Sequence, residues 1–419
     1  MKLVKTFGRG KAAAQALMEA LERRGSVNAA KVEKTVAAMV TNVRSRGDAA
    51  LRRYAAKLDG LAKGADLLVS REEMKAAWEA TAPELRAAMR AAQANIRAFA
   101  EAQKPKEWSI TPAAGVTTGQ MVRPLESVGC YLPGGRYPLP STLLMTVTPA
   151  QAAGVERIAV CSPKPARATL AAAWLAGVTE LYRVGGAQAI AAMAYGTETI
   201  ARVNKIVGPG NLFVTAAKML VAQECGIDMP AGPTEIVVTS ERGDAAGIAA
   251  DLVAQAEHDP ETLAVMITSN AALAEAVKAE VGAQAKGNAI ARKSIATRGY
   301  IFVTESVAEA RELTNRLAPE HLTVDSAADL KWVKNAGSVF VGNYSPQSMG
   351  DYISGPNHVL PTGRVGRVRG GLSVMDFVKV ITVQEYTRKG LRALGPHAIA
   401  LAEAEGLKGH AESVRVRME

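Results

Sequence analysis

The stretch IAVCSPKPARATLAAAWLAGVTELYRVGG, residues 158–186, decides the fold class. It opens with an apolar run at 158–161, continues through an alanine-rich segment that predicts a helix ending at Gly177, and returns to an apolar run at 181–184 before two glycines. A short strand, a helix and a second strand in this order form a βαβ unit, which belongs to a parallel sheet. The stretch therefore predicts an α/β protein.

The same alternation resumes in the second half of the chain, where a helix holding residues 251–257 lies among strand-like segments at 235–239, 263–267, 300–303 and 338–341. From Lys31 to about Gln103 the apolar spacing is helical, with a break at Arg46-Gly47-Asp48. We expect two Rossmann-like parallel-sheet domains. The expected division is a helical N-terminal arm at 1–24, a first α/β domain at 25–130 and 236–372, a second α/β domain at 131–235, and a helical C-terminal tail at 373–419.

The composition excludes several other classes of protein. With 419 residues and 48% hydrophobic content, the chain exceeds the usual size of a single core. No run approaches about eighteen apolar residues and the N-terminus lacks a secretory segment, so we expect a cytoplasmic protein without a membrane span. Three widely spaced cysteines argue against a disulfide framework. The net charge is +10, but the basic residues are spread along the chain, so no nucleic-acid partner is expected.

Histidine is scarce, and three of the five copies lie in compact polar motifs. An imidazole is both a metal ligand and a proton carrier near neutral pH. In the first motif, Asp251, Gln255 and His258 are four and three residues apart, so a helix presents them on one face. They either address a common ligand or form a helix end in which Gln255 and His258 bond backbone carbonyls.

The other two motifs combine an imidazole with a carboxylate. Glu320 and His321 are adjacent just before a strand-like segment at 322–324, either as two proton-transfer groups or as an exposed pair at a strand start. Asp351 lies in a segment at 350–358 with little regular periodicity, which reads as a loop or turn. Asp351 could complete a mixed nitrogen and oxygen site for zinc, whereas packing is the expected role of His358.

A nucleotide fingerprint is absent in its usual form. The match at residues 8–13, GRGKAA, lacks a convincing strand before it and an acidic residue after it. The turn Gly208-Pro209-Gly210-Asn211 follows a strand-like segment at 205–207 and opens a helix, but it has no third glycine. A dinucleotide would therefore bind outside the usual fingerprint.

The order of these motifs and the residues within them resemble the histidinol dehydrogenase family over almost the whole chain. The motifs that carry the resemblance lie at 128–135, 184–190, 207–211, 228–235, 255–258, 319–322 and 350–362.

The resemblance implies a homodimeric enzyme that binds one zinc ion per subunit. It would oxidise an amino alcohol to an amino acid in two NAD-dependent steps through an aldehyde. His321 would take the hydroxyl proton and Glu320 would help to activate water. The implied zinc ligands are Gln255, His258, Asp351 and, across an exchanged C-terminal segment, His410 of the partner subunit. The implied NAD contacts are Tyr131, Gln188 and Asn211. The implied substrate positions are Thr234, Gln255, His258, His321 and Asp351, with Glu405 and His410 supplied across the interface.

Two departures bear on the substrate. Thr234 stands where the family commonly has serine, which keeps the hydroxyl and adds a methyl group. The loop at 134–141 contains Arg136-Tyr137, which resembles a relative that oxidises dihydroxypropanesulfonate to sulfolactate, and an arginine suits a sulfonate. The completeness of the motifs favours histidinol, with the sulfonated diol as the alternative.

Overall fold

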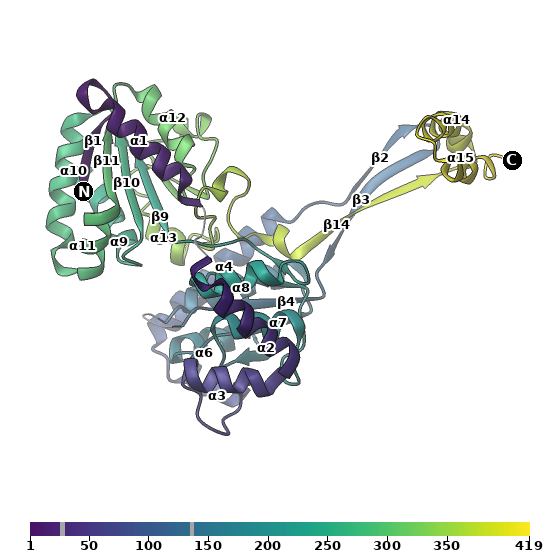
Figure 1. The fold of residues 1–419 in the computed structure, drawn as a ribbon, viewed down its shortest axis with the longest axis horizontal. Helices are drawn as coiled ribbons and strands as arrows, with labels where there is room; N and C mark the ends of the chain where they lie inside the picture. Colours follow the sequence, from purple (N-terminus) through teal and green to yellow (C-terminus); the bar gives the residue numbers. More distant parts are fainter. Residues whose placement is uncertain (26–29, 135–137) are drawn as a thin grey trace.

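The computed structural model describes residues 1–25, 30–134 and 138–419, which form two α/β units and a projecting arm (Figure 1). Each α/β unit is built on an all-parallel sheet. The arm is a three-stranded antiparallel sheet that ends in two helices. The predicted α/β class with two parallel-sheet units is confirmed.

The five-stranded sheet has the order β6-β5-β4-β7-β8. The chain moves outward from β4 to β5 and β6, then returns to the other side of β4 to form β7 and β8. This doubly wound order puts a topological switch point between β4 and β7, where ligands bind outside the carboxyl ends of the strands. The elements are β4 (Ser127–Tyr131), α5 (Pro140–Ala153), β5 (Arg157–Cys161), α6 (Arg167–Leu175), β6 (Glu180–Tyr182), α7 (Gly186–Tyr195), β7 (Lys205–Val207), α8 (Leu212–Val221) and β8 (Gly226–Ile227).

The six-stranded sheet repeats this winding around β9, in the order β1-β11-β10-β9-β12-β13. Its edge strand β1 corrects the prediction of a purely helical arm at 1–24, because Lys2–Lys5 pair in parallel with β11 before the first long helix begins. The elements are β1 (Lys2–Lys5), α1 (Lys11–Glu22), β9 (Glu235–Thr239), α9 (Ala245–Ala256), β10 (Leu263–Thr268), α10 (Ala271–Gln284), α11 (Ala289–Arg298), β11 (Gly299–Val303), α12 (Val307–Leu317), β12 (His321–Val324), β13 (Ser338–Val341) and α13 (Gln347–Tyr352), with short helical turns at Gly8–Gly10, Arg23–Gly25, Ala285–Gly287, Ala327–Lys331 and Val365–Arg367.

The three α-helices between residues 30 and 103 cover the five-stranded sheet, not the six-stranded one. Helix α2 (Ala30–Tyr54) packs on α7 and α8, α3 (Arg71–Glu79) on α6, and α4 (Pro83–Gln103) on α5. The expected assignment of residues 25–130 to the same domain as 236–372 differs from this packing. An apolar stripe predicts that a helix is covered but does not identify the sheet that covers it. The predicted break in this region is present, because Gly47 has φ +49 and kinks α2.

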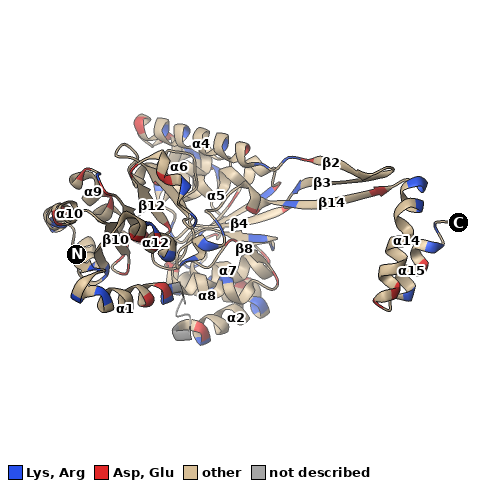
Figure 2. Cartoon of the chain, turned by 90° about the horizontal axis from the view of Figure 1, so that it is seen from above, with Lys and Arg blue, Asp and Glu red and all other residues tan. Residues whose placement is uncertain are grey.

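The arm consists of β2 (Trp108–Ala113), β3 (Val116–Pro124) and β14 (Val378–Tyr386), with α14 (Arg388–Ala404) and α15 (Lys408–Arg415) at its tip. The prediction of a purely helical tail at 373–419 is therefore wrong for its first part, because a short turn at Val374–Phe377 leads into a nine-residue strand. Most residues of the arm strands are uncharged (Figure 2): β2 has no charged residue, β3 has Arg123, and β14 has Lys379 and Glu385. Large apolar side chains are exposed along the arm, namely Trp108, Ile110, Val380, Ile381, Val383, Tyr386, Leu401, Leu407 and Val416.

None of the helices in the described ranges has the length and apolar character needed to cross a membrane. Cys130, Cys161 and Cys225 are buried and unpaired, as expected for small apolar side chains.

Helix α14 meets the β2–β3 turn through two glycines, which makes their contact testable. A Cβ atom added at Gly390 would lie 2.2 Å from the carbonyl oxygen of Gly115. We expect Gly390→Ala to lower the free energy of unfolding by about 2 kcal/mol, because overpacking outweighs the gain in helix propensity.

The matched control is Gly282→Ala in α10, where an added Cβ atom would meet nothing within 4 Å. This substitution should raise the free energy of unfolding by about 0.5–1 kcal/mol. Urea unfolding followed by circular dichroism measures both changes. A gain in stability for Gly390→Ala would contradict the close contact between the helix and the turn.

Candidate functional site

The predicted proton-transfer residues lie where the two α/β units meet. Glu320 and His321 stand at the amino end of β12, beside the start of β9. The seven residues 228–234 join the carboxyl end of β8 to the amino end of β9. The two sheet edges therefore lie within roughly 30 Å of each other. The site uses the amino edge of the six-stranded sheet, whereas α/β sheets more commonly use the carboxyl edge.

The main chain of Glu235 holds both proton-transfer residues. Its N–H donates to Glu320 Oε2 at 2.8 Å, and its carbonyl oxygen lies 3.0 Å from His321 Nδ1. His321 must carry its proton on Nδ1 to make this bond, so Nε2 is the basic nitrogen when the ring is neutral. The Glu235 carboxylate is in turn bound by Arg24, at 2.7 and 2.8 Å.

His321 Nε2 is the buried atom that best identifies a reactive position. His321 is 3% exposed, and Nε2 has no hydrogen-bond partner among the described residues. The nearest carboxylate oxygen is Asp351 Oδ1 at 3.8 Å, and both residues line a cavity of about 280 Å³. An unmade buried hydrogen bond costs about 1–3 kcal/mol, which indicates that a ligand completes it.

Burial also separates the two interpretations of the Glu320-His321 motif. Glu320 is 6% exposed, so the alternative of an exposed pair is wrong. Burial by itself would lower the pKa of His321, but the negative charges of Glu320 and Asp351 outweigh it and raise the pKa to about 10. The imidazole thus lies between the carboxylates of Glu320 and Asp351. This arrangement is typical of a residue that takes up and releases a proton.

A chain of hydrogen bonds links Gln255 to Glu320 through Thr234. Gln255 Nε2 donates to Thr234 Oγ1 at 2.5 Å, and the Thr234 hydroxyl donates to Glu320 Oε2 at 2.6 Å. The amide orientation leaves Gln255 Oε1 for another partner, and amide oxygen is the atom that binds cations. Asp251, on the same helix, accepts the main-chain N–H of Gln347 at 3.4 Å, and burial raises its pKa to about 6.

His258 has the ring orientation typical of a metal ligand. Its Nδ1 lies 3.2 and 3.1 Å from the carbonyl oxygens of Ala254 and Gln255, so Nδ1 carries the proton. Metal-bound imidazoles commonly donate their second N–H to a backbone carbonyl in this way. The same contacts also fit the alternative in which Gln255 and His258 only form the end of the helix. The metal interpretation therefore depends on Asp351, the other predicted ligand.

Asp351 lies in the short helix α13 (Gln347–Tyr352), so the prediction of a loop or turn is wrong for 350–352, whereas 353–358 form no regular element, as predicted. Burial raises the pKa of its carboxyl group, but the electrostatic interaction with His321 outweighs it, so the pKa lies below its usual value. Within 1–25, 30–134 and 138–419 no three His, Cys, Asp or Glu side chains form a metal cluster. The zinc ligands predicted from the two α/β units of one chain are His258, Asp351 and the amide of Gln255, so only two of the three are of these residue types.

His358 has its two ring nitrogens engaged within the fold. Nδ1 lies 2.8 Å from the carbonyl oxygen of Asp351, and Nε2 lies 3.2 Å from Thr142 Oγ1. Burial lowers the pKa of His358, which keeps the ring neutral. This geometry agrees with the packing role predicted for His358.

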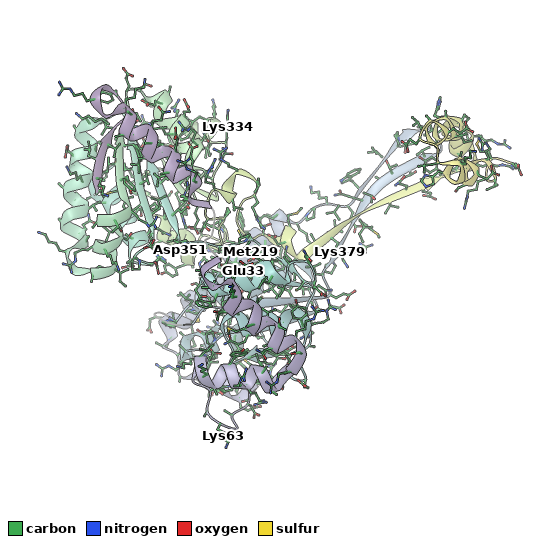
Figure 3. The ribbon with its side chains drawn as sticks, in the orientation of Figure 1. Glu33, Lys63, Met219, Lys334, Asp351 and Lys379 are labelled. Carbon is green, nitrogen blue, oxygen red and sulfur yellow. The ribbon has the colours of Figure 1, made fainter. Side chains whose placement is uncertain are left out.

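His410 and Glu405 lie apart from the rest of the predicted site. Glu405 ends α14, His410 lies in α15, and both are exposed. Asp351, labelled in Figure 3, lies where the two α/β units meet, whereas α14 and α15 form the far tip of the arm. One chain does not bring His410 and Glu405 to Gln255, His258 and Asp351.

The three predicted NAD residues lie at the carboxyl edge of the five-stranded sheet. Tyr131 ends β4, Gln188 lies in the first turn of α7, and Asn211 caps α8 by accepting from the N–H groups of Phe213 and Val214 at 3.0 and 3.2 Å. Tyr131 and Asn211 thus flank the switch point between β4 and β7. Gln188 is fully buried, and its Oε1 has no hydrogen-bond partner among the described residues.

Asp59 is a residue of this edge to which sequence reasoning gave no role. Its Oδ2 accepts from the Gln188 side chain at 3.1 Å and from the Gly185 N–H at 3.0 Å, and burial raises the pKa of the carboxyl group. Nothing in the local sequence around Asp59 indicates a partner 129 positions away. Arg136 and Tyr137, on which the sulfonated alternative rests, lie outside the described residues.

Comparisons with known proteins give one consistent result. Residues 22–418 match the family model described as "Histidinol dehydrogenase". A histidinol dehydrogenase of Methanosarcina barkeri is 47% identical over 96% of this chain and 95% of its own, and one of Gluconobacter oxydans is 46% identical over 95% of each. The crystal structure of histidinol dehydrogenase from Elizabethkingia anophelis matches with a TM-score of 0.93 and 35% identity, covering 100% of this chain and 98% of that one.

The Thr234 hydroxyl joins two buried polar groups, so its removal should be costly. We expect Thr234→Val to lower the free energy of unfolding by about 2 kcal/mol, because Gln255 Nε2 loses its acceptor and Glu320 loses one of its donors. Thr41→Val, at an exposed position of α2, serves as the control and should change stability by less than about 0.5 kcal/mol. Urea unfolding measures both, and equal stabilities of the two variants would contradict the hydrogen-bond chain.

Proposed function

This chain belongs to the histidinol dehydrogenase family, and we propose that it oxidises L-histidinol to L-histidine through L-histidinal, with two molecules of NAD⁺ and one zinc ion per subunit. The observation that carries the proposal is the buried Nε2 of His321, which faces a cavity beside Asp351 while Nδ1 is held by Glu235. A base in that position has the reach and the tautomer for taking a proton from an alcohol.

In the first step His321 removes the hydroxyl proton through Nε2 as the carbon gives a hydride to NAD⁺, which leaves the aldehyde. The Nδ1–H bond to the Glu235 carbonyl stabilises the imidazolium that results. Glu320, whose Oε2 lies 3.7 Å from Nδ1, adds a favourable negative charge. Neutralisation of the Asp351 charge by a bound cation would lower the pKa of His321 toward the range of a working base.

In the second step Glu320 takes a proton from water as the water oxygen attacks the aldehyde carbon. The hydrate anion formed in this way would give its hydride to a second NAD⁺ and its remaining hydroxyl proton to His321, which must first have released the proton of the first step to solvent, and the carboxylate results. The Thr234 hydroxyl and the Glu235 N–H keep one carboxylate oxygen of Glu320 fixed during this transfer. Two neighbouring proton-transfer groups therefore divide two successive oxidations between them.

The residues present fit a zinc ion. Gln255 offers an amide oxygen, His258 a nitrogen with its proton on the other ring atom, and Asp351 an ionised carboxylate, with His410 of the partner subunit as the fourth ligand. A zinc ion at this position would act as a Lewis acid and a template that orients the substrate hydroxyl.

The carboxyl edge of the five-stranded sheet is the proposed NAD position. Tyr131 and Asn211 flank its switch point, and the turn 208–211 opens α8. The amide orientation that Asp59 imposes leaves Gln188 Oε1 as an acceptor for a donor group of the cofactor. The adjoining edges of the two sheets would then bring the nicotinamide and the proton-transfer pair to opposite sides of one substrate.

We further propose a homodimer in which the arm of each subunit completes the site of the other. The arm exposes a row of apolar side chains and holds Glu405 and His410 far from the other site residues. A second copy of the chain would cover those side chains and receive the two polar residues. Substrate and zinc would then be bound by residues of two subunits.

The proposed reaction is tested by NADH production with zinc, NAD⁺ and either histidinol or dihydroxypropanesulfonate. We expect two NADH per histidinol consumed, no turnover of the sulfonate, and loss of activity after treatment with a chelator, with recovery on adding zinc. If only dihydroxypropanesulfonate is oxidised, the substrate of the proposed reaction is this sulfonated diol and not histidinol. Full activity after complete metal removal, verified by elemental analysis, would overturn the zinc assignment.

Mixed dimers test the exchange of the arm. His321→Ala and His410→Ala homodimers should both be inactive, whereas unfolding and refolding them together should restore about a quarter of the wild-type activity, because half of the dimers then contain one intact site. If His410 instead served its own subunit, neither site of a mixed dimer would be intact. Activity that stays at the level of the separate variants, with mixed dimers verified by mass, would contradict the exchange.

A further inference from the structure

A lysine and an aspartate form an ion pair buried beneath the turn that follows β7. The side chains of Lys218 and Asp228 are 2% and 1% exposed, and Lys218 Nζ binds Asp228 Oδ1 directly. Charged groups are almost never buried to this extent, and the desolvation of such a pair offsets much of its attraction. The mechanism proposed above does not use either residue.

Both partners bind the main chain of the same residue of the turn, Gly208. The N–H of Gly208 donates to Asp228 Oδ2 at 2.8 Å, and the carbonyl oxygen of Gly208 accepts from Lys218 Nζ at 2.8 Å. Gly208 has φ +114, and an added Cβ atom would lie 2.1 Å from the carbonyl oxygen of Tyr131. The ion pair therefore fixes the turn against the end of β4, at the switch point of the sheet.

The same pair is continuous with the segment that leads to the proton-transfer site. Asp228 is the first residue of the segment 228–234 and also accepts the N–H of Met229 at 2.6 Å. One helical turn from Lys218, the Thr215 hydroxyl of α8 donates to the carbonyl oxygen of Ala231 at 2.8 Å. Helix α8 thus contacts the segment at two points before it reaches Thr234.

We propose that Lys218 and Asp228 are positioning residues that hold the turn 208–211 in its cofactor-binding conformation and fix the segment ending at Thr234 relative to it. The proposal rests on the assignment of this edge to NAD. An ammonium group with three donors and a carboxylate with two acceptor oxygens satisfy both groups of Gly208 and each other, which an apolar pair cannot do.

The double variant Lys218→Met/Asp228→Asn tests the proposal without leaving an unpaired buried charge. We expect a folded protein whose KM for NAD⁺ rises roughly tenfold, because the hydrogen bond to the Gly208 carbonyl is lost. The kcat at saturating NAD⁺ should stay within about threefold of wild type, because the proton-transfer groups are intact. A purely structural role would lower the melting temperature and leave the KM for NAD⁺ unchanged, and this result would overturn the proposal.

A lysine on β7, the strand that leads into the turn, provides the matched control. Lys205 begins β7, at the end opposite Gly208, and its Nζ lies 3.0 Å from Asp376 Oδ1. Asp376 keeps its bond to Arg369 when Lys205 is replaced by methionine. The KM for NAD⁺ of Lys205→Met should stay within about twofold of wild type. An equal rise in both variants would show that the effect is not specific to the turn and would also overturn the proposal.

Hydrogen exchange of the wild-type chain keeps the proposal testable if the double variant does not fold. The amide of Gly208 should be protected without NAD⁺, because the ion pair already holds it. Rapid exchange there, with protection appearing only when NAD⁺ is added, would overturn the proposal. The proposed function has its own test, since it fails if the wild-type chain produces no NADH from histidinol. The protection of the Gly208 amide can still be measured in that case.

Discussion

The peptide groups of Glu235 hold a carboxylate and an imidazole side by side at the amino end of the six-stranded sheet. A side chain that held these two groups could change its rotamer. The main chain of Glu235 is fixed, because its strand β9 pairs with β10 on one side and β12 on the other. The Nδ1 bond to the Glu235 carbonyl sets the tautomer of His321, and the N–H bond sets the carboxylate of Glu320. Buried polar groups that are satisfied in this way are rigid, and His321 Nε2, which has no hydrogen-bond partner among the described residues, marks the direction of the proposed proton transfer.

The arrangement of the two sheets explains why the chain needs two similar units. Each is doubly wound, but one presents its carboxyl edge and the other its amino edge to the segment 228–234. The carboxyl edge has the turns and helix starts that suit phosphate and ribose groups. The amino edge has the strand starts on which the proton-transfer residues are fixed. A direct connection of seven residues keeps these two kinds of chemistry close together.

The sequence predicted those parts of the fold that depend on local patterns. The βαβ alternation, the turn at 208–211 and the kink at Gly47 are local features, and the structure contains them. The sequence did not predict β14, because a nine-residue strand with eight exposed residues on an isolated arm lacks the regular apolar alternation of a strand that covers a core. It also did not predict that α2 to α4 cover the five-stranded sheet, or that Asp59 binds Gln188, because both depend on contacts between distant parts of the chain. In the site, Glu320 and His321 could be identified because they are adjacent in the sequence. Their contacts with the main chain of Glu235 are visible only in the structure.

The exposed arm has a consequence for the life of the newly made chain. Both outer strands of its sheet, β2 and β14, have one edge without a neighbouring strand in the described part of the chain, and apolar side chains stand along them. Such an edge is a template for pairing with other chains. If the chain pairs with a second copy as proposed, a newly made subunit exposes these edges until that pairing occurs, and pairing with other unfolded chains competes with it.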